Sequence, residues 1–155
     1  MRTPVYEEPK EGIAMAPTDQ TGPGYAAFPE IQARDDLQVA IEVPLLVHLL
    51  RLPTAARIIE IGCGSGAALV ALQRLLRPSF LAGVDVDLAL LQQAAARFDA
   101  VGVDAELFDA DVRALPFADD TFDVVIDFGT CYHIAGATNA LLEIARVLRP
   151  GGLCT

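Results

Sequence analysis

The stretch from Arg57 to Gly66, which reads R-I-I-E-I-G-C-G-S-G, constrains the fold of this chain more than any other. Its first half, up to Ile61, is rich in isoleucine and suits a buried strand. Glycine then stands at every other position, and an apolar run of helix-favouring residues follows. Glycine suits such a turn because it adopts φ values that other residues resist and lets the backbone approach a ligand. A strand, a glycine turn and a helix in this order open a nucleotide-binding α/β unit.

The spacing of the glycines separates the classes of ligand. Gly62, Gly64 and Gly66 give G-x-G-x-G, and no lysine follows them. A dinucleotide-binding turn reads G-x-G-x-x-G instead, and a phosphate loop needs the lysine. We therefore expect a nucleoside ligand without a pyrophosphate, and a nicotinamide oxidoreductase is the disfavoured alternative.

The segment E-I-G-C-G-S-G, Glu60 to Gly66, resembles the first motif of class I S-adenosylmethionine (SAM) dependent methyltransferases, of the small-molecule type similar to methyltransferase domains 11 and 25. Three further parts of the chain agree with this family in order and spacing. They are G-V-D-V-D at Gly83 to Asp87, D-V-R-A-L-P-F with F-D-V-V-I-D between Asp111 and Asp127, and A-R-V-L-R-P-G-G at Ala145 to Gly152. The resemblance covers roughly Leu37 to the C-terminus.

The resemblance implies SAM as the cofactor and divides it among residues of this chain. Glu60 and the glycine turn would hold the methionine part, Asp111 would accept a hydrogen bond from the adenine amino group, and the Val112 amide would face the ring. Asp85 is also expected from its position, since an acid about 20 residues beyond a glycine turn reaches the ribose hydroxyls. The expected cofactor-binding residues are Glu60, Gly62, Cys63, Gly64, Gly66, Asp85, Val86, Ala110, Asp111, Val112, Asp127 and Phe128.

The pattern predicts an α/β fold, a Rossmann-like doubly wound and mostly parallel sheet with strand order 3-2-1-4, with or without a short fifth strand. Asp35 and Asp36 are expected to cap a helix that Pro44 interrupts. Expected helices cover residues 37–52, 67–76, 88–98 and 137–148, and expected strands cover 57–61, 80–84, 103–108, 122–128 and 153 onward.

The family normally continues through a fifth strand and an antiparallel pair, whereas this sequence stops at Thr155. The resemblance therefore implies a sheet truncated after the start of the fifth strand. We expect the fourth strand to be left as an edge that invites pairing with another chain, as in a homo-oligomer.

The N-terminal residues 1–34 are rich in proline, glycine and acidic residues, which predicts a flexible lead or a lid ahead of a SAM-binding domain at 35–155. Tyr25 and Phe28 are the features there that could touch a ligand. His48 is interpreted as a packing or surface histidine.

Composition excludes several functions. A net charge of −10 and a pI near 4.4 argue against a nucleic-acid partner. No apolar run reaches the roughly 18 residues of a membrane span, and no secretory signal is visible. The three cysteines are far apart and fit a reducing cytoplasm, and no metal-ligand spacing is present.

The loop D-F-G-T-C-Y-H-I, Asp127 to Ile134, follows the fourth strand, and ligands in such sheets bind beyond the carboxyl ends of strands. It lacks the N-P-P-Y sequence of nucleobase amino-methylating enzymes and the paired-glutamate loop of protein arginine methyltransferases. His133 is a candidate general base, or else a histidine without catalytic duty, and Cys131 is a weaker candidate as a nucleophile.

These features predict a SAM-dependent methyltransferase that acts on a small-molecule acceptor. Methyl transfer is an in-line attack on an activated carbon, so the protein contributes mainly alignment and desolvation and needs no metal. The alternative is a catalytically inactive SAM-binding module, or a fragment that needs a partner chain.

Overall fold

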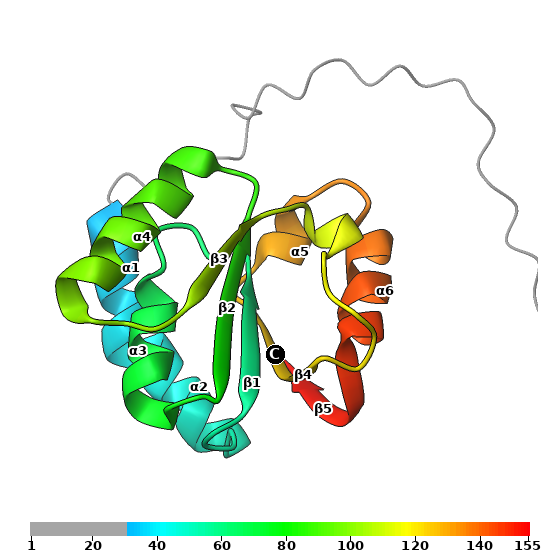
Figure 1. The fold of residues 1–155 in the computed structure, drawn as a ribbon, viewed down its shortest axis with the longest axis horizontal. Coiled ribbons are helices and arrows are strands. Elements are labelled where there is room, and N and C mark those ends of the chain that lie inside the picture. Colours follow the sequence, from blue (N-terminus) through cyan, green and yellow to red (C-terminus); the bar gives the residue numbers. More distant parts are fainter. Residues whose placement is uncertain (1–30) are drawn as a thin grey trace, which may run out of the picture. The chain divides into compact units, whose positions relative to one another are not determined.

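The structure is a computed structural model that describes residues 31–155. The proposed ligand contacts of Tyr25 and Phe28, and most of the expected lid, lie outside these residues. In the described part, five parallel strands form one sheet in the order β3-β2-β1-β4-β5, with helices on both faces (Figure 1). The expected Rossmann-like α/β fold and the 3-2-1-4 order are confirmed, and a fifth strand extends the sheet beyond β4.

The strands of this sheet are β1 Arg57–Ile61, β2 Phe80–Asp85, β3 Glu106–Asp109, β4 Phe122–Asp127 and β5 Leu148–Cys154. The helices are α1 Ile31–Leu37, the π-helical turn η1 Gln38–Glu42, α2 Val43–Leu50, α3 Ala67–Leu76, α4 Leu88–Val101, the 3-10 turn η2 Val112–Ala114, α5 Thr130–His133 and α6 Ala137–Val147. The short helix α5 was not expected from the sequence. Helix α4 runs three residues further than predicted, and β3 starts three residues later.

Isoleucine and valine fill β1 and β4 because both faces of these strands are buried. Successive side chains of a strand point to opposite faces, so Ile58 and Val124 pack with α3 and α4, while Ile59 and Val125 pack with α6. All four side chains are fully buried. Figure 1 shows α1 to α4 on one face of the sheet and α5 and α6 on the other.

The N-terminal helices differ from their prediction. Residues 31–34, which we assigned to the N-terminal segment, are helical, and Asp35 and Asp36 lie inside α1. Their prediction as N-caps is therefore wrong, because the Asp35 carboxylate takes partners from other parts of the fold, described below. Pro44 lies in the first turn of α2, where its missing N–H is tolerated, and the wider turn η1 precedes it.

The β4 edge is also different from its prediction. Phe122 pairs with Leu148 and Val124 pairs with Leu153, so the four residues 149–152 bulge out of β5. Gly151 adopts a φ of +80° within this bulge. The proline and glycines thus interrupt the strand without ending it, and β4 is paired on both sides. The expectation that β4 is the open edge is wrong; in the part of the sheet that the structure describes, the edges are β3 and β5.

Candidate functional site

The carboxyl ends of three strands meet where the strand order reverses. Ile61 at the end of β1 lies in register with Val84 of β2 on one side and with Asp127 of β4 on the other. Parallel α/β sheets bind ligands in the crevice at such a reversal. The turn after β1, with Asp85 after Val84, therefore lies where a ligand is expected.

The three glycines of the turn after β1 all have positive φ, at +63°, +50° and +71° for Gly62, Gly64 and Gly66. A Cβ on Gly62 would lie 1.8 Å from Thr130 Oγ1, and one on Gly66 would lie 2.7 Å from the Phe98 ring. Packing therefore requires glycine at both positions. Gly64 has only a leucine methyl at 3.9 Å, so its backbone faces open space that a ligand can approach.

The carboxylate of Asp85 fastens this turn to β2. Its Oδ2 accepts a hydrogen bond from the Gly64 amide at 2.8 Å, and its Oδ1 accepts one from the Asp87 amide at 2.9 Å. The backbone oxygen of Asp85 accepts a third bond, from the Ala110 amide, at 3.2 Å. An ionised carboxylate has about four acceptor sites, so Asp85 keeps capacity for two hydroxyl donors beside the glycine turn.

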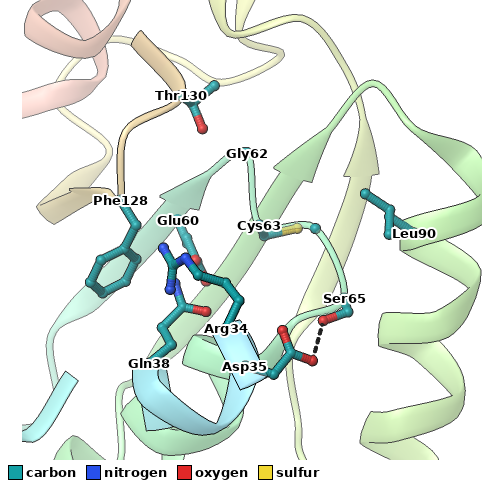
Figure 2. Close-up of a pocket in the computed structure, with 11 residues that line it drawn as sticks. Arg34, Asp35, Gln38, Glu60, Gly62, Cys63, Ser65, Leu90, Phe128 and Thr130 are labelled. Carbon is teal, nitrogen blue, oxygen red and sulfur yellow. Dashed lines mark hydrogen bonds between the residues drawn. The ribbon is translucent and has the colours of Figure 1, made fainter. Parts of the chain in front are cut away.

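A pocket of about 210 Å³ lies against the turn, between α1 and the end of β4 (Figure 2). Five expected cofactor residues line it: Glu60, Gly62, Cys63, Gly64 and Phe128. Six others that sequence reasoning missed line it too: Arg34, Asp35, Gln38, Ser65, Leu90 and Thr130. Ser65 stands inside the recognised motif and could have been included. The residues of α1 carry no local signal, because only the tertiary fold brings them to the turn.

Glu60 is the most unusual side chain of the pocket. It is 2% exposed, and its Oε2 has no hydrogen-bond partner among the described residues. Burial raises the pKa of Glu60 well above its ordinary value, Arg34 opposes this rise, and Asp85 and Asp127 add to it. Figure 2 shows the Arg34 and Glu60 side chains directed toward each other across the pocket. A buried acceptor without a partner, on the wall of a pocket, suits a donor group of a ligand.

Asp35 joins three elements beside the pocket. Its Oδ2 accepts hydrogen bonds from Ser65 Oγ at 2.8 Å and from Arg97 Nη2 at 2.5 Å, and the first of these is drawn in Figure 2. Asp35 is 7% exposed. Because Ser65 belongs to the glycine turn and Arg97 to α4, this carboxylate holds α1 against both.

The residues expected around adenine lie outside the lining of this pocket. Asp111 is tied to Arg113, whose Nε and Nη2 donate to it at 2.9 and 2.5 Å, and Arg113 lowers the pKa of the Asp111 carboxyl. Val112 is buried and starts η2, so its amide has no partner within that turn. Val86 is 65% exposed. The adenine contacts of this group stay a prediction.

Asp127 has a clear structural role at the start of α5. Its carboxylate accepts hydrogen bonds from the amides of Gly129, Thr130 and Cys131 at 2.8, 2.5 and 3.1 Å. These bonds cap a helix that follows a glycine at φ +115°. Asp127 does not line the pocket, so its expected contact with the cofactor stays a prediction, whereas Phe128 beside it does line the pocket.

The thiols are poorly suited to nucleophilic chemistry. Burial and a hydrogen bond to Asp127 raise the pKa of Cys131 to about 12, and burial raises the pKa of Cys63 still further. Both side chains are therefore neutral thiols near pH 7. His133 ends α5 on the surface, with its ring 5.3 Å from that of Tyr132, and does not line the pocket. Its role as a base stays a prediction. His48 is exposed on α2.

Among residues 31–155, no group of three or more His, Cys, Asp or Glu side chains could hold a metal ion. Within the same residues, every helix is too short or too polar to cross a membrane.

Comparison with known proteins identifies the family of this chain. A family model described as a methyltransferase domain matches residues 58–152. The chain is 32% identical over 102 residues to the ubiquinone/menaquinone biosynthesis C-methyltransferase UbiE of Desulfotalea psychrophila, covering 66% of this chain and 41% of that protein. It is 34% identical over 96 residues to the fatty-acid O-methyltransferase of Mycolicibacterium smegmatis, covering 62% of this chain and 34% of that protein.

The fold has solved counterparts as well. The YcgJ protein from Bacillus subtilis matches with a TM-score of 0.66 and 25% identity, covering 71% of this chain and 47% of that one. The chain thus spans less than half the length of these two relatives and of this structure. Because the family model covers more than half of the chain and includes the glycine turn and Asp85, the chain belongs to the methyltransferase domain family of class I, SAM-dependent type.

Proposed function

We propose that this chain binds SAM at the glycine turn after β1 and takes part in transferring its methyl group to a small-molecule acceptor. The observation that carries the proposal is Glu60, which presents a buried oxygen without a partner to a pocket beside the turn. The residues present fit the cofactor, since the Glu60 carboxylate can accept hydrogen bonds from the ammonium group of the methionine part. SAM supplies a methyl group that its sulfonium already activates.

The chain's own residues divide the binding work as follows. Glu60 accepts from the amino group of the methionine part, and the open backbone at Gly64 lets that part approach closely. Asp85 accepts from the ribose hydroxyls while it keeps its bond to the Gly64 amide. Asp111 and the Val112 amide receive the adenine, with Val86 and Ala110 beside the ring. The protein thereby fixes the orientation of the methyl group and excludes water from it.

The acceptor enters from the side of Phe128, the residue that follows β4 and lines the first pocket. The names of the two relatives refer to quinone biosynthesis and to fatty acids, which supports a small molecule over a nucleic acid as the acceptor. The net charge of −10 also supports a small molecule over a nucleic acid.

Three free cysteines support a cytoplasmic location. The β5 edge is the place where a second copy could extend the sheet.

Calorimetric titration tests this proposal. SAM and its demethylated product, S-adenosylhomocysteine, should both bind with one site per chain, and NAD should not bind. Binding of NAD without SAM would overturn the proposal. Release of labelled methyl groups to a panel of quinones, phenols and fatty acids then tests transfer, and SAM binding without any transfer would leave a binding module.

A further inference from the structure

A second pocket of about 380 Å³ lies beside the first, under helix α2. Its walls are four leucines of one helix, the ring of Phe128, and the side chains of Arg34 and Glu42; the leucines are Leu45, Leu46, Leu49 and Leu50. Three of these leucines are strongly exposed, Leu49 at 66%, Leu45 at 51% and Leu50 at 44%. Exposed leucines gathered around a hollow are unusual on a protein surface unless something binds there.

The two pockets share two walls. Arg34 and Phe128 line both of them, Arg34 from α1 and Phe128 from the position directly after β4. A methyl acceptor must lie in line with the donor at short distance. The pocket that adjoins the proposed donor site is therefore the best placed to hold the acceptor.

The lining defines the chemistry of the occupant. Its two charged groups, Arg34 and Glu42, are bonded to each other at 2.9 Å, and the other five walls are apolar. Such a surface gives a sugar or a nucleotide few hydrogen-bond partners, but it can cover a hydrocarbon chain or ring system. The volume lies at the lower end of the range of small-molecule pockets.

We infer that this second pocket binds the apolar portion of the methyl acceptor, a lipophilic small molecule whose polar reacting group points past Phe128 toward the first pocket. The inference rests on the proposed function for its choice of occupant. It adds the class of acceptor and names Leu45, Leu49 and Phe128 as residues that select it.

Straight-chain fatty acids and the matching alcohols are suitable probes, titrated into the full chain saturated with S-adenosylhomocysteine. Hexanoic, decanoic and tetradecanoic chains should bind with rising affinity, by up to about fourfold for each methylene that is buried, and the gain should stop once the pocket is full. Comparing acids with alcohols shows whether Arg34 contributes to recognition of the polar group.

A matched pair of variants locates the binding. Leu49→Asp should lower the affinity for decanoic acid at least tenfold, whereas Leu142→Asp should change that affinity less than twofold. Leu142 is a fair control because it is 64% exposed and lies on α6, against the other face of the sheet. Both variants should keep their affinity for SAM and their circular dichroism spectrum, because an exposed leucine contributes little to folding.

The outcomes separate this inference from the proposed function. Loss of SAM binding by the unchanged chain overturns the proposed function. SAM binding without any probe binding overturns the inference alone, as do equal effects of the two variants or an affinity that ignores chain length. The other possible occupant of the pocket is a second copy of the chain, which analytical ultracentrifugation can detect. If Leu49→Asp converts dimers to monomers and the dimer binds no probe, the pocket is a contact between copies and the inference fails.

Discussion

The Asp85 carboxylate and the Gly64 amide, 21 residues apart, are joined by a hydrogen bond of 2.8 Å. This bond makes one unit of the end of β2 and the turn after β1. A change at either residue should therefore alter both the shape of the turn and the affinity for a ligand that binds on it.

Replacing Asp85 tests this unit. Asp85→Ala should weaken SAM binding by about 1.5 to 3 kcal/mol, since it removes a charged acceptor and frees the Gly64 amide. Calorimetry measures the change, and Asp104→Ala is the control because it removes the same charge from an exposed loop. An unchanged affinity in Asp85→Ala would remove this residue from the site.

Glu60 should make SAM binding depend on protons. Burial raises the pKa of Glu60 in the free protein, and an ammonium partner would lower that pKa again by favouring the ionised form. Binding should therefore release protons, which calorimetry detects as a heat that varies with the ionisation enthalpy of the buffer. Glu60→Gln should abolish that variation; equal proton release in both proteins would show that another group is responsible.

Glu60 should also affect stability without a ligand. A carboxyl whose pKa is raised in the folded state contributes its full stability below its unfolded pKa of about 4.3 and loses it as pH rises through the folded pKa. Glu60→Gln should therefore have a higher Tm than the parent at neutral pH, and the difference should vanish near pH 4. Thermal unfolding at several pH values measures it. A Tm difference that does not change with pH would contradict the burial of this charge.

Gly62 and Thr130 should be energetically coupled. A Cβ on Gly62 would lie 1.8 Å from Thr130 Oγ1 and would also strain a backbone at φ +63°. Gly62→Ala should cost about 1 to 3 kcal/mol in the free energy of unfolding. Thr130→Ala should recover part of that loss in the double variant, although it also removes the bond from Thr130 to the Ile61 oxygen. Urea denaturation of the four proteins of this cycle tests the coupling, and strict additivity would refute it.

Asp127 should act mainly as a helix cap. Asp127→Ala should cost about 0.5 to 2 kcal/mol in the free energy of unfolding, whereas Asp127→Asn should keep most of the stability because its side-chain oxygen still accepts from the α5 amides. Urea denaturation measures both. If Asp127→Asn loses affinity for SAM while it keeps its stability, the carboxylate also contacts the cofactor, as the sequence predicts.

The sequence was informative wherever function depends on a few consecutive residues. The alternating glycines and the spacing to Asp85 predicted a turn and a carboxylate that the fold joins by a hydrogen bond. Isoleucine and valine runs predicted β1 and β4 within one residue. In these segments the same few consecutive residues determine both the local backbone conformation and the contacts with distant parts of the chain.

Tertiary contacts explain most of what was missed. Asp35 looked like a cap because an aspartate before an apolar run usually is one, yet its partners Ser65 and Arg97 come from distant elements. Asp127 shows the reverse, because the hydrogen bonds that its carboxylate accepts are local ones that cap α5; its expected contact with the cofactor stays a prediction. The sequence R-P-G-G usually ends a helix or strand. Here it forms the bulge within β5, and pairing with β4 resumes at Leu153.

The attachment of α1 through Asp35 has a consequence for how a ligand could be exchanged. Moving α1 away from the first pocket would break the bonds of Asp35 to Ser65 and Arg97 together, because both donors belong to elements outside α1. We therefore expect α1 to be either fully packed against the glycine turn and α4 or fully detached from both, because the same carboxylate oxygen makes both bonds. Any ligand exchange that requires α1 to move would then also require Asp35 to give up both of its partners.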